Sequence, residues 1–295
     1  MDARRDHKAT EDIAAIPLDD ERYPPLLREI HHAPPVLYVR GNIAALRHPL
    51  PVAVVGTRKM TAYGSAATRT IVGPAAAAGA AIVSGLALGI DAAAHEAALR
   101  SGGTTVAVLA GGVDAPSVGP RTNAALAERI VASGGALVSE RPPGSAPSKI
   151  AFPLRNRIIA GMSRGTLVIE AAAKSGSLIT AYLALEDGRD VFAVPGPIFS
   201  PLSAGANGFI RRGAALVTCA DELLSYYGLG AEERKARAAR TEAERTVLRA
   251  LAEGPLGADG IVAATGLDVR SALAALTSLT LAGAVAEERG AYLKN

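Results

Sequence analysis

The stretch Thr166-Leu-Val-Ile-Glu-Ala-Ala-Ala-Lys-Ser-Gly-Ser-Leu-Ile-Thr180 passes from an apolar run through a small polar turn into a second apolar segment. Its first part, Thr166–Glu170, does not alternate with polar residues, which is typical of a strand buried on both faces of a parallel sheet. The turn holds a lysine, two serines and a glycine. We interpret the stretch as a strand, a turn and the start of a helix.

Similar apolar runs recur along the chain, separated by 19–26 residues, which is enough for crossover helices. The predicted fold class is α/β, with a Rossmann-like, doubly wound, mostly parallel sheet. Ligands of such sheets bind beyond the carboxyl ends of the strands. The predicted strands are Val52–Gly56, Ala81–Ser84, Thr105–Leu109, Ala136–Ser139, Thr166–Glu170 and Asp190–Val194.

Composition divides the chain into four predicted parts. Residues 1–46 are a polar, proline-bearing lead-in, expected to pack in extended form on the main domain, with residues 1–12 loose. Residues 47–225 form the Rossmann-like domain, and residues 226–241 form a densely charged linker. Residues 242–295 resemble a winged helix-turn-helix, with a hairpin that turns at Arg289-Gly290. Its predicted helices are Glu242–Glu253, Asp259–Ala264 and Val269–Leu281.

Composition and charge narrow the function classes. Cys219 is the only cysteine, which excludes an internal disulfide and fits a reducing cytoplasm. The charged N-terminus argues against a secretory signal, and the alanine-rich runs are too short and broken to span a bilayer. We therefore expect a cytoplasmic protein without membrane contact. Residues 47–225 contain 16 Lys and Arg against 11 Asp and Glu, a bias expected of a polyanion binder.

The turn after Glu170 is the strongest candidate site. A strand, a small-residue turn and a helix start offer free N–H groups and a positive dipole end to an anion. Lys174 adds a charge, and the hydroxyls of Ser175, Ser177 and Thr180 surround Gly176. The chain has no G-x-x-x-x-G-K-[ST] motif, so ATP hydrolysis is not expected.

A second candidate lies in Phe152-Pro-Leu-Arg155-Asn156-Arg157. Cations near a helix start oppose the helix dipole, so their presence there favours a bound anion. We predict phosphate contacts from Arg155 and Asn156, and a stacking surface for a base on Phe152.

Gly56-Thr57-Arg58 follows the first strand of the main domain. It lacks the G-x-G-x-x-G pattern of dinucleotide folds, so no cofactor is expected. We predict that this turn binds phosphate through Arg58, although a helix-capping arginine is an equal alternative. Asn207, Arg211 and Arg212 are candidate rim contacts, although each could equally be a turn residue or a solvated charge.

Asp91 and His95 are four residues apart and would share one helix face. An acid/base pair is one interpretation, but we favour a structural cap and a buried, hydrogen-bonded histidine. No metal site is predicted, since no other histidine or cysteine lies nearby.

Together these motifs resemble the DNA-processing protein A (DprA/Smf) family. Tyr23-Pro and Pro35–Gly41 fit the family's lead-in, and the helical module that precedes it in many relatives is not expected here. Gly112–Leu126 departs from the family, because it lacks the tyrosine of a Tyr-Pro segment. The phrases that carry the resemblance are Val54–Arg58, Ser84–His95, Ser139-Glu140, Phe152–Gly161, Glu170–Ala181, Phe192–Gly196 and Gly205–Ala214.

The resemblance implies a non-enzymatic protein that binds and protects single-stranded DNA and helps to load the RecA recombinase in natural transformation. It implies a homodimer formed through the Rossmann-like domain, and DNA contacts from Arg58 and Lys174, with Ser175–Ser177 and Arg155-Asn156 as further transfers. The tail resembles the winged-helix module of some relatives. Its candidate recognition helix offers only Arg270, so we expect a protein contact there rather than strong DNA binding.

Two other functions stay open at this point. Rossmann-like nucleoside-monophosphate phosphoribohydrolases resemble this fold, but they use a Pro-Gly-Gly-x-Gly-Thr-x-x-Glu loop. Lys174–Thr180 has no glutamate at the matching place. A sequence-specific regulator that reads duplex DNA through residues 242–295 is the second alternative.

Overall fold

The computed structural model describes residues 13–148, 150–229, 242–281, 284–288 and 290–294. The predicted loose segment 1–12 and most of the predicted linker lie outside these residues. The chain forms two compact units, the first ending at Gly228 and the second beginning at Leu229.

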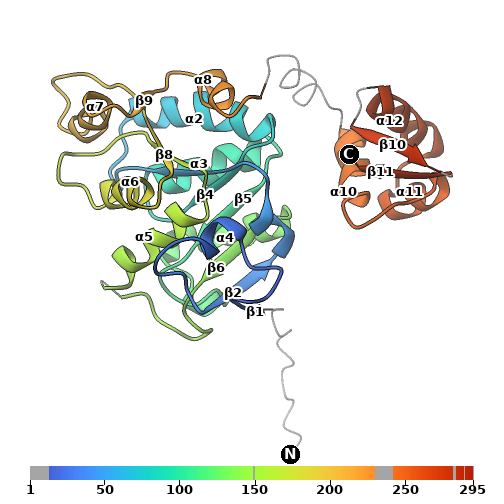
Figure 1. The fold of residues 1–295 in the computed structure, drawn as a ribbon, viewed down its shortest axis with the longest axis horizontal. Helices are drawn as coiled ribbons and strands as arrows, with labels where there is room; N and C mark the ends of the chain where they lie inside the picture. Colours follow the sequence, from blue (N-terminus) through green and yellow to red (C-terminus); the bar gives the residue numbers. More distant parts are fainter. Residues whose placement is uncertain (1–12, 149, 230–241, 282–283, 289, 295) are drawn as a thin grey trace, which may run out of the picture. The chain divides into compact units, whose positions relative to one another are not determined.

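The first unit, shown in Figure 1, is built on one sheet in the order β1-β2-β6-β5-β4-β3-β7-β8-β9. From β6 to β9 all neighbours are parallel. The six predicted strands are confirmed, each within two residues of its predicted bounds. The strands are β1 (Ile13–Pro17), β2 (Val36–Gly41), β3 (Pro51–Val55), β4 (Ala81–Ser84), β5 (Thr105–Val108), β6 (Ala136–Ser139), β7 (Gly165–Val168), β8 (Asp190–Ala193) and β9 (Ala215–Leu216).

Helices cover both faces of the sheet. Successive side chains of a strand point to opposite faces. Val106 and Val108 therefore share one core cluster with residues of the helices Ala151–Gly161 and Ser177–Glu186, whereas Ala107 and Leu109 share another with residues of the helix Ala124–Ala132. The helices are α1 (Pro25–Arg28), α2 (Ala62–Ala77), α3 (Ile90–Arg100), α4 (Ala124–Ala132), α5 (Ala151–Gly161), α6 (Ser177–Glu186), α7 (Ala204–Arg211) and α8 (Ala220–Tyr226), and the 3-10 helices are η1 (Ile43–Arg47), η2 (Ala115–Ser117) and η3 (Arg121–Asn123).

We predicted that the lead-in packs in extended form on the main domain. In the structure it is also part of the sheet. β1 pairs antiparallel with β2, and β2 pairs antiparallel with β6. The lead-in also supplies core side chains, since Tyr23 and Leu27 are fully buried. The Tyr23 hydroxyl donates to the Pro34 carbonyl at 2.8 Å, which closes the loop between the two strands.

The second unit has the winged-helix pattern that the tail sequence predicts. Helix α10 (Glu242–Ala250) ends earlier than predicted, whereas α11 (Ala258–Thr265) and α12 (Val269–Leu281) match closely. The hairpin pairs β10 (Val285–Glu288) with β11 (Ala291–Lys294). Its core contains Val247, Leu248, Leu251, Ile261, Ala275, Leu276, Leu279 and Val285.

Among the described helices, none alone is long and apolar enough to cross a membrane. The bent pair Ala258–Thr265 and Val269–Thr280 passes that test by length and composition only.

Candidate functional site at the strand ends

The predicted site turns follow adjacent strands in the middle of the sheet. β3 lies between β4 and β7, and the chain reaches β7 only after it has formed β4, β5 and β6 on the other side of β3. The strand order therefore reverses between β3 and β7, and α/β sheets bind ligands at such a switch point. Arg58 follows β3 and Lys174 follows β7, so the sheet brings both predicted cations to this place.

Glu170 fixes the turn between β3 and α2. The Thr57 N–H donates to the Glu170 carbonyl at 2.6 Å. The Glu170 carboxylate accepts the Thr61 N–H at 3.0 Å and the Thr61 hydroxyl at 2.6 Å. A Cβ on Gly64 would lie only 2.1 Å from Glu170 Oε2, so this buried carboxylate fits closely against α2. We assigned Glu170 no role from the sequence, although an acid at the end of a buried strand was the available signal.

Gly56 and Thr57 shape this turn rather than face solvent. A Cβ on Gly56 would lie 2.5 Å from Ile90 Cγ1 and 2.8 Å from the Glu170 carbonyl oxygen. Thr57 is buried, and its hydroxyl accepts the Lys59 N–H at 3.1 Å. Both were predicted phosphate contacts, and in the structure their surroundings are filled by protein atoms.

Arg58 is exposed and packs on α5. Its guanidinium carbon lies 5.0 Å from the centroid of the Phe152 ring, which is half-buried. Such a cation–π contact is worth about 0.5–1 kcal/mol at an exposed site. The contact brings two predicted site residues together, and it places a cation and an accessible ring on one surface.

Lys174 is exposed in the turn between β7 and α6. The Ser175 and Ser177 hydroxyls lie 2.8 Å apart, so one donates to the other. The Asn156 amide of α5 donates to the Gly176 carbonyl at 3.5 Å. The turn therefore combines the predicted residues, and it places a positive charge beside two hydroxyls.

The start of α6 offers fewer free donors than predicted. The N–H groups of Leu178 and Ile179 donate to carbonyl groups of the same turn, at 3.1 and 3.2 Å. Thr180 is 1% exposed and has no surface for a phosphate contact. The binding capacity of this turn therefore rests on Lys174 and the two serine hydroxyls.

Arg155 is a buried clamp and does not face solvent, contrary to its predicted role as a phosphate contact. It is 5% exposed, and its Nη1 donates to the Gly85 carbonyl at 2.6 Å and to the Val108 carbonyl at 2.5 Å. These carbonyls belong to the end of β5 and the turn after β4. Burial lowers the pKa of Arg155 to about 10, although Asp91 favours its charged form. The guanidinium stays charged at neutral pH and holds the two strand ends together.

Arg157 also has an internal partner. It forms an ion pair with Glu140, which follows β6. Arg155 and Arg157 are the fifth and seventh residues of α5, beyond its first turn, and both are bonded within the protein. We predicted an anion beside cations at a helix start, and that prediction was wrong here.

Asp91 and His95 are both buried in α3 and bond different groups. The Asp91 carboxylate accepts the Gly85 N–H at 3.2 Å, and burial raises its pKa. His95 Nδ1 lies 2.7 Å from the Thr105 hydroxyl, which donates to the Ile82 carbonyl. Nδ1 must therefore carry the proton, and burial lowers the pKa of His95 to about 3. The pair has the structural role that we favoured, although Asp91 lies in the first turn of α3 and not at its N-cap.

The predicted rim residues differ in their surroundings. The Asn207 amide makes two bonds to the Gly196 backbone, each of 3.0 Å, and so fixes the loop between β8 and α7. Arg211 and Arg212 are exposed, and the Arg212 guanidinium carbon lies 5.9 Å from the Tyr182 ring centroid. Of the three rim residues, only the two arginines therefore present a charge to solvent.

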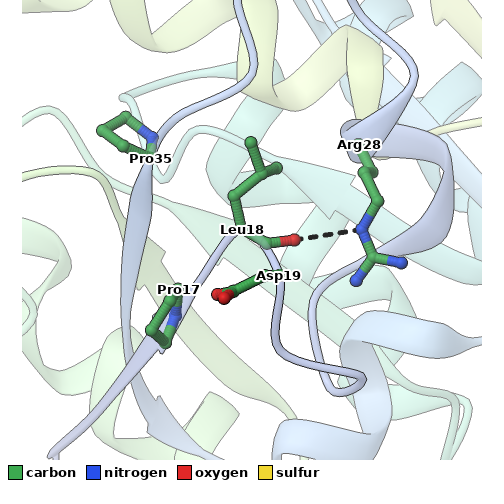
Figure 2. Close-up of a pocket in the computed structure, with 5 residues that line it drawn as sticks. All are labelled: Pro17, Leu18, Asp19, Arg28 and Pro35. Carbon is green, nitrogen blue, oxygen red and sulfur yellow. Dashed lines mark hydrogen bonds between the residues drawn. The ribbon is translucent and has the colours of Figure 1, made fainter.

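A shallow hollow of about 500 Å³ lies in the lead-in, away from these turns. Figure 2 shows its lining residues, where Arg28 Nε donates to the Leu18 carbonyl at 3.1 Å. Among the described residues, no group of three or more His, Cys, Asp or Glu side chains could hold a metal ion. The hollow is lined by Pro17, Leu18, Asp19, Arg28 and Pro35.

The family model of DNA recombination-mediator protein A matches residues 14–228, which contain every turn described above. The chain belongs to the DNA recombination-mediator protein A family. A second model, the DprA winged helix domain, matches residues 231–291.

Relatives of the recombination-mediator family align over the first unit. Protein Smf of Escherichia coli is 47% identical over 215 residues, which cover 73% of this chain and 57% of that protein. The chain thus spans a little over half of that relative. The DprA structure of Streptococcus pneumoniae is 43% identical, with a TM-score of 0.68, and the match covers 73% of this chain and 74% of that one.

A third relative is the DNA processing protein A of Helicobacter pylori. Its structure, which concerns a single-stranded DNA binding mode, is 29% identical to this chain with a TM-score of 0.65. The match covers 73% of this chain and 95% of that one.

Proposed function

We propose that this protein binds single-stranded DNA along the strand-end surface of its first unit. The observation that carries the proposal is the exposure of Arg58 and Lys174 on neighbouring turns at the switch point of the sheet. Serine hydroxyls and the Phe152 ring lie beside these cations. Cations that follow a backbone, together with rings on which bases stack, are the usual means of binding single strands.

The biological role that we propose is protection of incoming DNA and loading of the RecA recombinase during natural transformation. Membership of the recombination-mediator family supports this role, and the single-stranded DNA binding mode named for the Helicobacter pylori relative supports its DNA-binding part. We also propose that the protein acts as a homodimer joined through the first unit. Sedimentation of the full chain, alone and with RecA, tests both associations.

We propose that the site has no catalytic activity. A phosphoribohydrolase needs a reachable carboxylate, but Glu170 is 2% exposed and bonded to Thr61. Asp91 and His95 are buried as well. Release of adenine from AMP by the purified protein, abolished by Glu170→Gln, would favour the enzyme instead.

The binding proposal is tested by fluorescence anisotropy with single- and double-stranded oligonucleotides over a range of salt concentrations. Binding through phosphates releases counterions, so the logarithm of the affinity should fall with the logarithm of salt by about 0.7 per phosphate contacted. We expect a steep slope and a preference for the single strand. An affinity that does not depend on salt would exclude a phosphate-binding surface.

A further inference from the structure

The loop between β8 and α7 holds an aromatic side chain in solvent. Phe199 is 93% exposed and Ile198 is 83% exposed. They occupy the two central positions of a tight turn, closed by a bond of 3.0 Å from the Ser200 N–H to the Pro197 carbonyl. Burial of a phenylalanine side chain is strongly favourable. A ring that a fixed backbone keeps in solvent therefore indicates a contact with a ligand or partner.

The backbone of this loop is fixed on several sides. The Asn207 amide holds Gly196 through two hydrogen bonds, and the Ser203 N–H donates to the Ser200 carbonyl at 3.0 Å. Prolines at positions 195, 197 and 201 restrict the chain further. The exposure of Phe199 is therefore built into the loop.

Hydrogen bonds join the loop to α2, and join the start of α7 that follows the loop to the segment after β7. The Tyr63 hydroxyl donates to the Pro195 carbonyl, and Tyr63 lies five residues after Arg58. On the other side, the Gly205 N–H donates at 2.8 Å to the carbonyl of Ala171, three residues before Lys174. The exposed ring thus extends from a loop that contacts the elements carrying both cations.

The charge of this region suits a polyanion. Residues 191–220 contain no Asp or Glu, and they include Arg211 and Arg212. Residues 171–185 contain no acid either, and they include Lys174. A DNA strand that passes these cations near Phe199 would therefore meet no carboxylate side chain from either segment.

We propose that Phe199 stacks on a nucleobase of a single strand whose phosphates lie on Arg58 and Lys174. The inference rests on the proposed function and adds a contact with bases at the β8 end of the surface. Ile198 supplies apolar area beside the ring but no π face. Stacking on an aromatic side chain is tolerant of sequence, because every base has a π face.

The test uses the full chain and two probes of equal length, an oligothymidylate and an abasic strand with the same number of phosphates. Phe199→Ala should weaken binding of the oligothymidylate about 5- to 100-fold and leave binding of the abasic strand unchanged. Phe199→Trp should retain the preference for bases. Ile198→Ala is the matched control, with a smaller effect expected, and thermal unfolding of all variants should agree.

Three results would overturn the inference. Equal weakening on both probes would show that Phe199 does not act through bases. Unchanged binding of both probes, with altered sedimentation of Phe199→Ala, would show that the turn covers a protein partner or a second copy. Failure of the wild type to bind either probe would reject the proposed function itself, which the other two outcomes leave intact.

Discussion

At the scale of single residues, burial separates the cations that shape the site from those that can reach a ligand. Arg155 donates to carbonyls at two strand ends and lies near the Asp91 carboxylate, whereas Arg58 and Lys174 are exposed. A guanidinium that satisfies buried carbonyls stabilises the protein, since an unpaired buried acceptor costs about 1–3 kcal/mol. Arg155 therefore positions the site without contacting the strand.

Replacement of Arg155 by methionine should lower the free energy of unfolding by about 2–4 kcal/mol, because the carbonyls of Gly85 and Val108 lose their donor. Urea denaturation measures this loss. The salt dependence of DNA binding by the folded variant should keep the wild-type slope. If stability were unchanged and the slope fell by about 0.7, Arg155 would be a direct phosphate contact.

His95 should make the stability depend on pH. The folded protein keeps this imidazole neutral down to a pKa of about 3, whereas the unfolded chain protonates it near its ordinary pKa of 6.5. The stabilisation is thus complete above pH 6.5 and is lost as the pH falls towards 3, by at most about 1.4 kcal/mol per pH unit. Burial raises the pKa of Asp91, so this carboxyl changes the stability with pH in the opposite direction. Its effect is present in the wild type and in every variant that retains Asp91.

Urea denaturation of the wild type and His95→Gln between about pH 7 and pH 5 isolates the histidine. We expect the wild type to lose stability more steeply with falling pH than the variant does. Parallel curves would show that His95 does not titrate on unfolding as described.

The predictions for single residues failed where the orientation of a helix decides whether a side chain is buried or exposed. Arg155 lies four residues after Ala151 and four before Ile159, and all three are on the buried face of α5. A period of four residues is present in the sequence and places Arg155 in line with apolar residues. The bonds made by Glu170 could not be predicted, because its partner Thr61 is far away in the chain.

At the scale of elements, each site turn is held by a neighbouring strand or helix. Glu170 at the end of β7 bonds Thr61 at the start of α2, and the glycine at position 64 gives its carboxylate room. The geometry around Arg58 therefore depends on β7 as well as on β3. A substitution that displaces this carboxylate should therefore weaken DNA binding at the site.

Gly64→Ala should destabilise the protein by about 1–3 kcal/mol and weaken DNA binding, since its Cβ would overlap the Glu170 carboxylate. Gly208→Ala is the matched control, because it is also helical and its Cβ would meet no atom within 4 Å. The control should gain up to about 1 kcal/mol from helix propensity. Equal thermal stability of the two variants would contradict the role of Glu170.

Strands that are apolar and consecutive in the sheet were predicted correctly, since their pattern is local. The strands of the lead-in were missed, because β2 pairs with β6, which lies about a hundred residues later in the chain. β9 has only two residues and carries no periodic signal. Local patterns thus predict the parallel core, whereas its edges depend on long-range pairing.

At the scale of the whole molecule, the two units differ in charge. Residues 1–228 contain 22 Lys and Arg against 19 Asp and Glu, whereas residues 229–295 contain nine of each. Affinity for nucleic acid comes largely from neutralised phosphates. We therefore assign single-strand binding to the first unit.

A chain that ends at Gly228 should bind single-stranded DNA within about threefold of the full-length protein. This end point retains Tyr226 and Tyr227, whose hydroxyls donate to Asp190 at 2.9 and 3.1 Å. Anisotropy of the shortened and full chains measures the difference. Loss of most of the affinity on truncation, or a duplex footprint made by residues 242–295 alone, would assign DNA binding to the winged-helix unit.

The most direct test of the strand-end surface is a salt titration of single-strand binding by Arg58→Ala, Lys174→Ala and the double variant. Arg100→Ala is the matched control, since Arg100 is an exposed cation at the other end of α3 from the site. Each site variant should weaken binding and reduce the salt slope by about 0.7, the double variant by about 1.4, and the control should behave as wild type. Binding by the double variant with wild-type affinity and slope would contradict the account.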